Sequence, residues 1–144
     1  MDGVLVDFQS GIDKLSDREK IDFFGKEDEV PHIFSKMNPM KDAIESFKLL
    51  CHHHDTYILS TSPWMNPTAA NDKIEWVKKH LGKCAEKRLI LSHHKNLNKG
   101  DYLIDDNNGD KRGADKFEGE LLHFGSGKKF ENWDAIIKYL IHIK

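Results

Sequence analysis

Short apolar runs alternate with amphipathic helical stretches along most of this chain, and the alternation limits the folds that it can adopt. Four runs have the length and composition of buried strands: residues 56–61, 88–91, 102–104 and 120–124. Three stretches carry an apolar helical face: about residues 39–53, 71–81 and from 132 onward. Short buried strands that alternate with such helices predict an α/β fold, with a Rossmann-like parallel sheet flanked by helices.

Capping residues set the expected helix boundaries. Asn38 is expected to cap the first helix, with Pro39 at its first position. Gly82 is expected to end the second helix, and Asn132 to open the last one.

The segment from about residue 9 to residue 38 differs from the rest because it is rich in charges. Ser16 and Glu19 form a capping box ahead of a short helix that ends near Gly25, and a further helical turn is expected after Pro31. We interpret this segment as a small helical cap inserted above the sheet. Residues 1–144 are therefore expected to form one domain with a cap at about residues 9–38.

Composition excludes several classes of protein. The net charge is −2 with both signs interspersed, which does not suggest a nucleic-acid or membrane surface. No stretch reaches the roughly 20 apolar residues of a membrane helix, and no signal peptide opens the chain. Two cysteines, Cys51 and Cys84, are too few for a disulfide framework and are expected to be free thiols in the cytoplasm.

Two other motifs carry weaker signals. The run Cys51-His52-His53-His54 suggests a zinc site, but consecutive helical residues point in different directions and cannot all bind one ion. The segment Gly125-Ser-Gly-Lys-Lys129 lacks the spacing of a phosphate-binding loop, so it is interpreted as a turn before the last helix.

Polar residues follow the apolar runs at the points where ligands bind in parallel sheets, outside the carboxyl ends of the strands. Thr61 and Ser62 end one run, and Asp105 and Asp106 directly follow another. Carboxylates and hydroxyls at one sheet edge are suited to a hard cation and a phosphate. Two lysines in the intervening segments, and one aspartate near the start of the chain, complete the expected set: Lys73, Lys95 and Asp2.

Taken in order, these residues resemble the motifs of the haloacid dehalogenase (HAD) superfamily, and in particular its 5′(3′)-deoxyribonucleotidase branch. The resemblance covers nearly the whole chain. It rests on these segments: Met1-Asp2-Gly3-Val4-Leu5, Leu59-Ser-Thr61-Ser-Pro63, Asp72-Lys73-Ile-Glu-Trp-Val77, Lys95, Asp105-Asp106 and Asn132-Trp-Asp-Ala-Ile136.

The resemblance implies a Mg²⁺-dependent phosphatase that acts on a small phosphate ester, with a nucleoside monophosphate as the first choice. It implies that Asp2 is the general acid and base, and that its backbone carbonyl and Asp105 hold the metal. The phosphate would be bound by Thr61, Ser62, Lys73 and Lys95, with Asp106 in a supporting role. Phe8 and Trp64 are expected to flank the substrate, while Phe23, Phe24 and Phe34 either add to its pocket or pin the cap to the body.

One departure from the family pattern affects the chemistry. The family's nucleophile is an aspartate that would stand immediately before Met1, at the end of a central strand. We therefore expect that the chain as given is truncated, lacks this strand and is inactive as a phosphatase. A different class stays open as the alternative, a non-catalytic HAD-like protein that binds magnesium and phosphate. The oligomeric state is not predicted.

Overall fold

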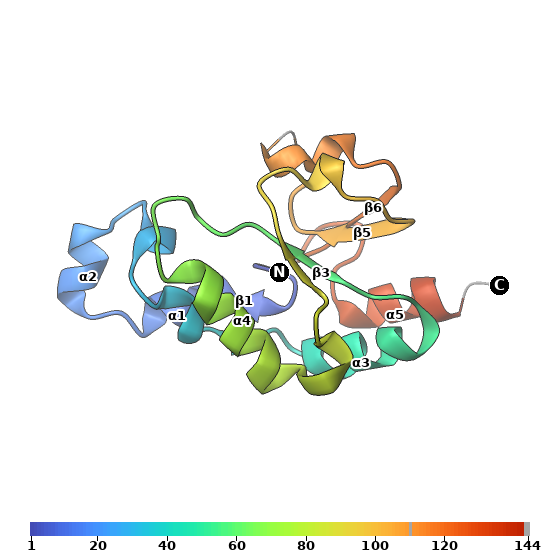
Figure 1. Cartoon of the computed structure of the whole chain (residues 1–144), viewed down its shortest axis with the longest axis horizontal. Coiled ribbons are helices and arrows are strands. Elements are labelled where there is room, and N and C mark those ends of the chain that lie inside the picture. Colours follow the sequence, from blue (N-terminus) through green and yellow to red (C-terminus); the bar gives the residue numbers. More distant parts are fainter. Residues whose placement is uncertain (110, 143–144) are drawn as a thin grey trace.

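The computed structural model describes residues 1–109 and 111–142, and it has the expected mixed α/β composition (Figure 1). Six short strands form three separate two-stranded sheets. β1 (Val6–Asp7) pairs antiparallel with β2 (Asn38–Pro39). β3 (Ile58–Ser60) runs parallel to β4 (Leu89–Leu91), and β5 (Tyr102–Asp105) runs parallel to β6 (Glu120–His123). The four predicted strands are confirmed, but within the described residues they do not join into one continuous sheet.

Three longer helices cover these strands. α3 (Ala43–His53) and α5 (Trp133–Ile141) lie side by side in Figure 1, and α4 (Ala69–His80) packs against β4 and the cap. Short 3-10 turns follow: η3 (Gly82–Ala85), η4 (Lys95–Leu97) and η5 (Lys111–Lys116). The core between these elements includes Phe47, Leu50, Trp76, Leu122, Phe124, Trp133 and Ile136. None of the described helices is both long and apolar enough to cross a membrane.

The first helix begins later than its capping signals predict. Asn38 and Pro39 form β2, and the Asn38 N–H donates to Ser10 Oγ at 2.8 Å instead of leading into a helix. The helix starts only after Asp42, whose φ of 64° is left-handed and incompatible with a continuous helix. By contrast, Asn132 caps α5 as expected, accepting a hydrogen bond from the Ala135 N–H.

The segment expected to form the cap contains α1 (Phe8–Asp13), α2 (Asp17–Asp22), η1 (Glu27–Glu29) and η2 (Ile33–Ser35). The predicted capping box of Ser16 and Glu19 is present at the start of α2. The helical turn expected after Pro31 is η2.

A buried asparagine joins this segment to the rest of the chain by hydrogen bonds. Asn66 lies in the loop after β3 and is only 3% exposed. Its amide nitrogen donates to the carbonyls of Asp28 and Val30 at 2.9 and 3.0 Å. Its amide oxygen accepts from the N–H and the hydroxyl of Thr68 at 3.0 and 2.7 Å. Each polar atom of the side chain is thus paired, as a buried amide requires.

The outer edges of β3 and β5, on the sides away from β4 and β6, pair with no strand among the described residues. In a parallel pair, alternate residues bond to the same neighbour. The Ile58 N–H donates to Arg88 O, and Ser60 O accepts from Ser92 N, so the backbone groups of Leu59 point to the opposite side. Asp101 O and Asp105 O accept from the β6 strand and its following residue, so the backbone groups of Ile104 likewise point away from β6.

The two unpaired edges face the same cavity, which has a volume of about 500 Å³. Residues of both β3 and β5 line it, together with Met1 and apolar residues that include Val4, Phe47, Leu50, Trp133 and Leu140. The cavity therefore has the walls that an extended apolar segment needs, backbone edges on two sides and core side chains around it.

Candidate active site

Lys73 is the most deeply buried of the predicted site residues. It belongs to α4, and its side chain is 0% exposed. Its ammonium donates to Thr61 O at 2.6 Å and to Ser60 Oγ at 2.7 Å, and it lies 3.4 Å from Asp2 Oδ2. Burial lowers the pKa of Lys73, and the nearby Asp2 carboxylate opposes this shift. α4 thus places the Lys73 ammonium at the carboxyl end of β3.

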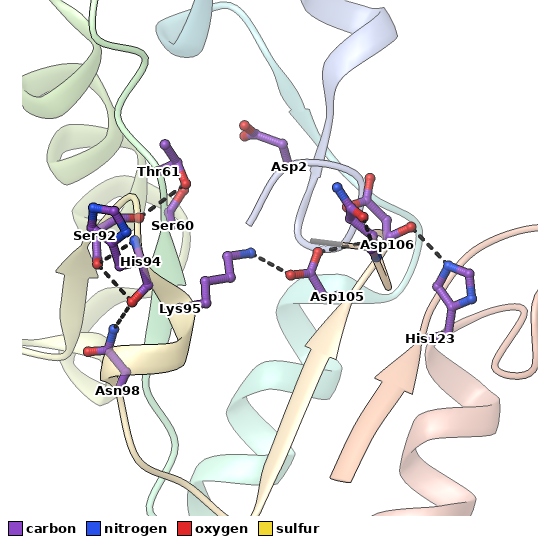
Figure 2. A network of polar contacts seen from close by, with 12 residues as sticks. Asp2, Ser60, Thr61, Ser92, His94, Lys95, Asn98, Asp105, Asp106 and His123 are labelled. Atoms are coloured by element: carbon purple, nitrogen blue, oxygen red, sulfur yellow. Dashed lines mark hydrogen bonds and ion pairs between the residues drawn. The ribbon is translucent and has the colours of Figure 1, made fainter. Parts of the chain in front are cut away.

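Asp2 lies in a tight turn at the start of the chain (Figure 2). Its Oδ1 is buried and has no hydrogen-bond partner among the residues that the structure describes. The turn is possible because residue 3 is glycine, with φ of 73°, and a Cβ there would lie 2.2 Å from Asp106 Oδ2. An unpaired buried carboxylate oxygen is costly unless a ligand supplies a proton donor or a cation.

Lys95 and Asp105 form a second buried ion pair, with Lys95 Nζ 2.5 Å from Asp105 Oδ2 (Figure 2). Lys95 opens η4, after β4, and Asp105 ends β5. Burial by itself raises the pKa of Asp105, but Lys95 and the Asn107 N–H favour the carboxylate, and the net pKa lies below its usual value. The ionised form of Asp105 is therefore favoured.

Asp106 follows directly, in the loop after β5. Burial and the neighbouring Asp105 carboxylate raise the pKa of Asp106. Two carboxyl groups in this position repel each other, and a bound cation would relieve the repulsion.

The Thr61 hydroxyl donates to Ser92 O at 3.1 Å (Figure 2), while the Thr61 carbonyl accepts from Lys73. Thr61 is buried and Ser62 is half-buried. The structure thus places Thr61 beside Lys73, but the hydroxyl proton that would serve a phosphate is directed at a backbone carbonyl.

The two aromatic residues expected at the substrate lie in different surroundings. Phe8 is half-buried, and its ring meets the edge of the Phe34 ring with centroids 6.0 Å apart. Trp64 is 87% exposed, and its ring lies 6.0 Å from that of His93. Phe8 therefore packs against another aromatic residue of the segment α1–η2, Phe34, whereas Trp64 lies on the surface.

Phe34 is a site residue whose position the sequence did not settle. The Lys73 ammonium lies 4.4 Å from the centroid of its ring, and Phe34 is 2% exposed. The ring therefore stabilises the buried cation through its π face. Phe24, in contrast, is 84% exposed. A cap aromatic close to the lysine of the body could not be identified from sequence spacing, because the contact joins segments 39 residues apart.

Whether these residues suit Mg²⁺ depends on which oxygen atoms they offer as ligands. No group of three or more His, Cys, Asp or Glu side chains in the described ranges forms a metal cage. Mg²⁺ needs no such cage, because it binds through one or two carboxylates, water and phosphate oxygens. The acidic pair, Asp105 and Asp106, offers oxygen ligands of this type.

Two buried lysines, each paired with a carboxylate beside parallel strand pairs, form an arrangement that is suited to binding phosphate. The comparison with known families is specific: the chain belongs to the family described as 5′ nucleotidase, deoxy (pyrimidine), cytosolic type C protein, whose profile matches residues 1–135. The resemblance to the deoxyribonucleotidase branch is thereby confirmed.

Individual relatives agree with this assignment. A protein of Vibrio phage KVP40 named as a 5′(3′)-deoxyribonucleotidase is 56% identical over 140 residues, which are 97% of this chain and 81% of that protein. A Bordetella pertussis protein with the same name is 31% identical over 130 residues, covering 73% of this chain and 70% of its own length. A third, from Staphylococcus epidermidis, is 33% identical over 94 residues, 65% of this chain and 50% of that protein.

Proposed function

We propose that this chain is a magnesium-dependent phosphatase that hydrolyses nucleoside monophosphates. The observation that carries the proposal is the fully buried Lys73, whose ammonium lies between the end of β3 and the Asp2 carboxylate. Burying an ammonium costs several kcal/mol, roughly, unless strong partners compensate. A phosphate dianion is such a partner, and a site that keeps this cation dehydrated binds the anion strongly.

The phosphoryl group would be bound by Lys73 and Lys95, together with Thr61 and Ser62. Both lysines are buried, so their charges act at low dielectric and are screened little by water. Binding requires the Thr61 hydroxyl to turn from Ser92 O toward the phosphate, which is a single rotation about its C–O bond. Such charge neutralisation is the main contribution that proteins make to phosphoryl transfer.

Asp2 would act as the general acid and base. One oxygen of its carboxylate faces Lys73, and Oδ1 has no partner among the described residues, so this oxygen can exchange a proton with the ester oxygen. Asp105 and the Asp2 carbonyl would hold the Mg²⁺, with Asp106 in support. The cation would supply charge neutralisation at the phosphate.

The nucleophile in the proposal is an aspartate immediately before Met1, at the end of a strand that occupies the cavity between β3 and β5. Two features support it. The unpaired edges of β3 and β5 face this cavity. Met1 is buried, and burial lowers the pKa of its amino group while Asp2, Lys95 and Lys73 also influence it, so a residue added before Met1 would enter the site. The aspartyl-phosphate of the proposal requires this carboxylate, so a polypeptide that lacks it should be inactive.

Substrate choice rests on the relatives and on the aromatic residues. The relatives are named for 5′(3′)-deoxyribonucleotides, and Phe8 and Trp64 are the candidates to contact the base. A cytoplasmic setting completes the proposal, supported by two free cysteines and a net charge of −2. The cap at about residues 9–38 would form one domain with the body.

The test compares two polypeptides. One is residues 1–144, and the other carries an added apolar strand of about six residues that ends in Asp before Met1. Phosphate release is measured from deoxynucleoside monophosphates and from p-nitrophenyl phosphate, with and without Mg²⁺. Activity of the extended form alone, lost in its Asp2→Asn variant, supports the proposal. A folded extended form that is inert toward both substrates favours the alternative, a non-catalytic protein that binds magnesium and phosphate.

A further inference from the structure

The backbone carbonyl of Asp106 is held by two side chains from the segment after β5. Lys128 Nζ donates to this oxygen at 2.7 Å, and His123 Nε2 lies 3.1 Å from it (Figure 2 shows His123 directed at Asp106). A carbonyl oxygen only accepts, so His123 carries a proton on Nε2. Both lone pairs of the Asp106 carbonyl are therefore used.

This carbonyl and the Asn107 N–H belong to one peptide group. No cis peptide occurs among the described residues, so the C=O and N–H of this group point in opposite directions in one plane. The Asn107 N–H donates to Asp105 Oδ1 at 3.1 Å. Fixing the carbonyl end therefore fixes the N–H that holds the Asp105 carboxylate. The other oxygen of Asp105, Oδ2, is bound by Lys95 at 2.5 Å.

The glycine-rich segment after β6 directs Lys128 back toward this peptide. The Gly125 N–H donates to Phe130 O at 2.9 Å, and the Lys128 N–H donates to Gly125 O at 3.0 Å, which closes a tight turn. Gly125 has φ of 135°, and a Cβ there would lie 3.3 Å from Lys128 Cδ. A side chain at position 125 would crowd the lysine, so glycine leaves room for Lys128 to cross the turn.

We propose that Lys128 is a positioning residue, which acts with His123 through the 106–107 peptide to orient Asp105. The inference deepens the proposed function and rests on the role of Asp105 as the magnesium ligand. A cationic donor on the carbonyl also polarises the peptide and strengthens the N–H bond to Asp105. Lys128 is half-buried and is bound to backbone, so its role is distinct from the phosphate-binding role of Lys73 and Lys95.

The neighbouring Lys129 provides a matched control. It is exposed, and its ammonium lies 5.6 Å from the centroid of the Phe130 ring. Lys129→Met removes the same charge from the same turn without touching Asp106. Lys128→Arg keeps a cationic donor, and Lys128→Met removes it. Thermal unfolding of all three variants tests whether each is folded.

The first readout is Mn²⁺ binding, followed by the electron paramagnetic resonance signal of the free ion. We expect Lys128→Met to weaken Mn²⁺ binding about tenfold, because outer-shell partners of metal ligands contribute effects of this size. Lys128→Arg should restore most of the affinity, and Lys129→Met should leave it unchanged. Equal affinity in Lys128→Met and the unchanged chain overturns the inference.

The second readout needs no metal, so it separates this inference from the proposed function. In the metal-free protein, the Asn107 amide proton should exchange with solvent about tenfold faster in Lys128→Met, and should move upfield as its hydrogen bond weakens. Lys129→Met should leave both unchanged. If the unchanged chain binds no Mn²⁺, the metal site of the proposed function fails. If the exchange rate and chemical shift of the Asn107 amide proton in Lys128→Met equal those in Lys129→Met, the positioning role of Lys128 fails.

Discussion

Lys73 Nζ lies 3.4 Å from Asp2 Oδ2, although the two residues are 71 positions apart and the lysine side chain is fully buried. The contact joins α4 to the first turn of the chain. It places a cation beside a carboxylate whose Oδ1 has no hydrogen-bond partner among the described residues.

The first prediction concerns this lysine. Lys73→Met should abolish binding of inorganic phosphate, because it removes a dehydrated cation from the site. It should also lower the free energy of unfolding by about 1–3 kcal/mol, since Thr61 O and Ser60 Oγ lose their donor. Phosphate binding by calorimetry and urea unfolding measure the two effects. Lys79→Met, an exposed lysine of the same helix, is the control and should change neither. Phosphate affinity retained in Lys73→Met would contradict the role given to Lys73.

The second prediction concerns the Phe34 ring over the Lys73 ammonium, with 4.4 Å between the ring centroid and Nζ. Phe34→Leu keeps an apolar side chain in the core but removes the π face. A double-mutant cycle with Lys73→Met should give a coupling free energy of about 0.5–2 kcal/mol, measured by urea unfolding. A coupling of zero would show that Phe34 acts only through packing, and that the ring does not stabilise the cation.

The third prediction concerns the attachment of the cap through Asn66. Asn66→Ala leaves the carbonyls of Asp28 and Val30 without their donor and should lower the free energy of unfolding by about 1–3 kcal/mol. Amide exchange should accelerate in residues 28–32 more than in β5 and β6. Asn71→Ala, at an exposed position of α4, is the control. Uniform acceleration throughout the protein would contradict a local fastening of the cap.

Much of this fold follows from local sequence patterns. The four strands and the faces of α4 and α5 were predicted because strand runs and helical periodicity are local properties. The capping roles of Ser16 and Asn132 were predicted for the same reason. The helix start predicted at Asn38 was wrong, because Asn38 pairs in β2 with Asp7, a residue 31 positions away, and this pairing overrides the local helix signal.

The same difference between local patterns and long-range contacts decides which parts of the site could be predicted. The positions of Asp2, Thr61, Lys73, Lys95 and Asp105 near the strand ends follow from the order of the elements and the rule for parallel sheets. The contacts of Phe34 and Lys128 do not, because they depend on tertiary packing between segments with no shared period. Gly125 and Gly127 were the sequence feature that could have indicated the position of Lys128. Two glycines before a lysine mark a tight turn, and such a turn can direct the lysine side chain back toward the preceding strand.

The fourth prediction is a pH dependence of stability in the 144-residue polypeptide. Burial lowers the pKa of the Met1 amino group from 8.0 to about 6, so the folded state favours the neutral amine. Between these pH values the unfolded chain binds more protons than the folded chain, and stability therefore rises with pH. The gain should be about 2–3 kcal/mol between pH 5.5 and 8.5, roughly. Urea unfolding measures the gain, and a ¹⁵N titration of the amino group identifies its source. A midpoint near 8 for this group would contradict its burial.

The last prediction concerns Gly3, whose φ of 73° and missing side chain let the Asp106 carboxyl approach the first turn. Gly3→Ala should be destabilised by the left-handed backbone, about 1–2 kcal/mol, and further by a Cβ that would lie 2.2 Å from Asp106 Oδ2. Gly25→Ala separates the two effects, because Gly25 has a similar φ of 78° but a Cβ there would meet no atom within 4 Å. We expect urea unfolding to show a larger loss for Gly3→Ala, and Mn²⁺ binding to weaken only there. Equal losses in both variants would mean that Asp106 moves aside freely, and that the close approach of Gly3 does not hold the acidic pair in place.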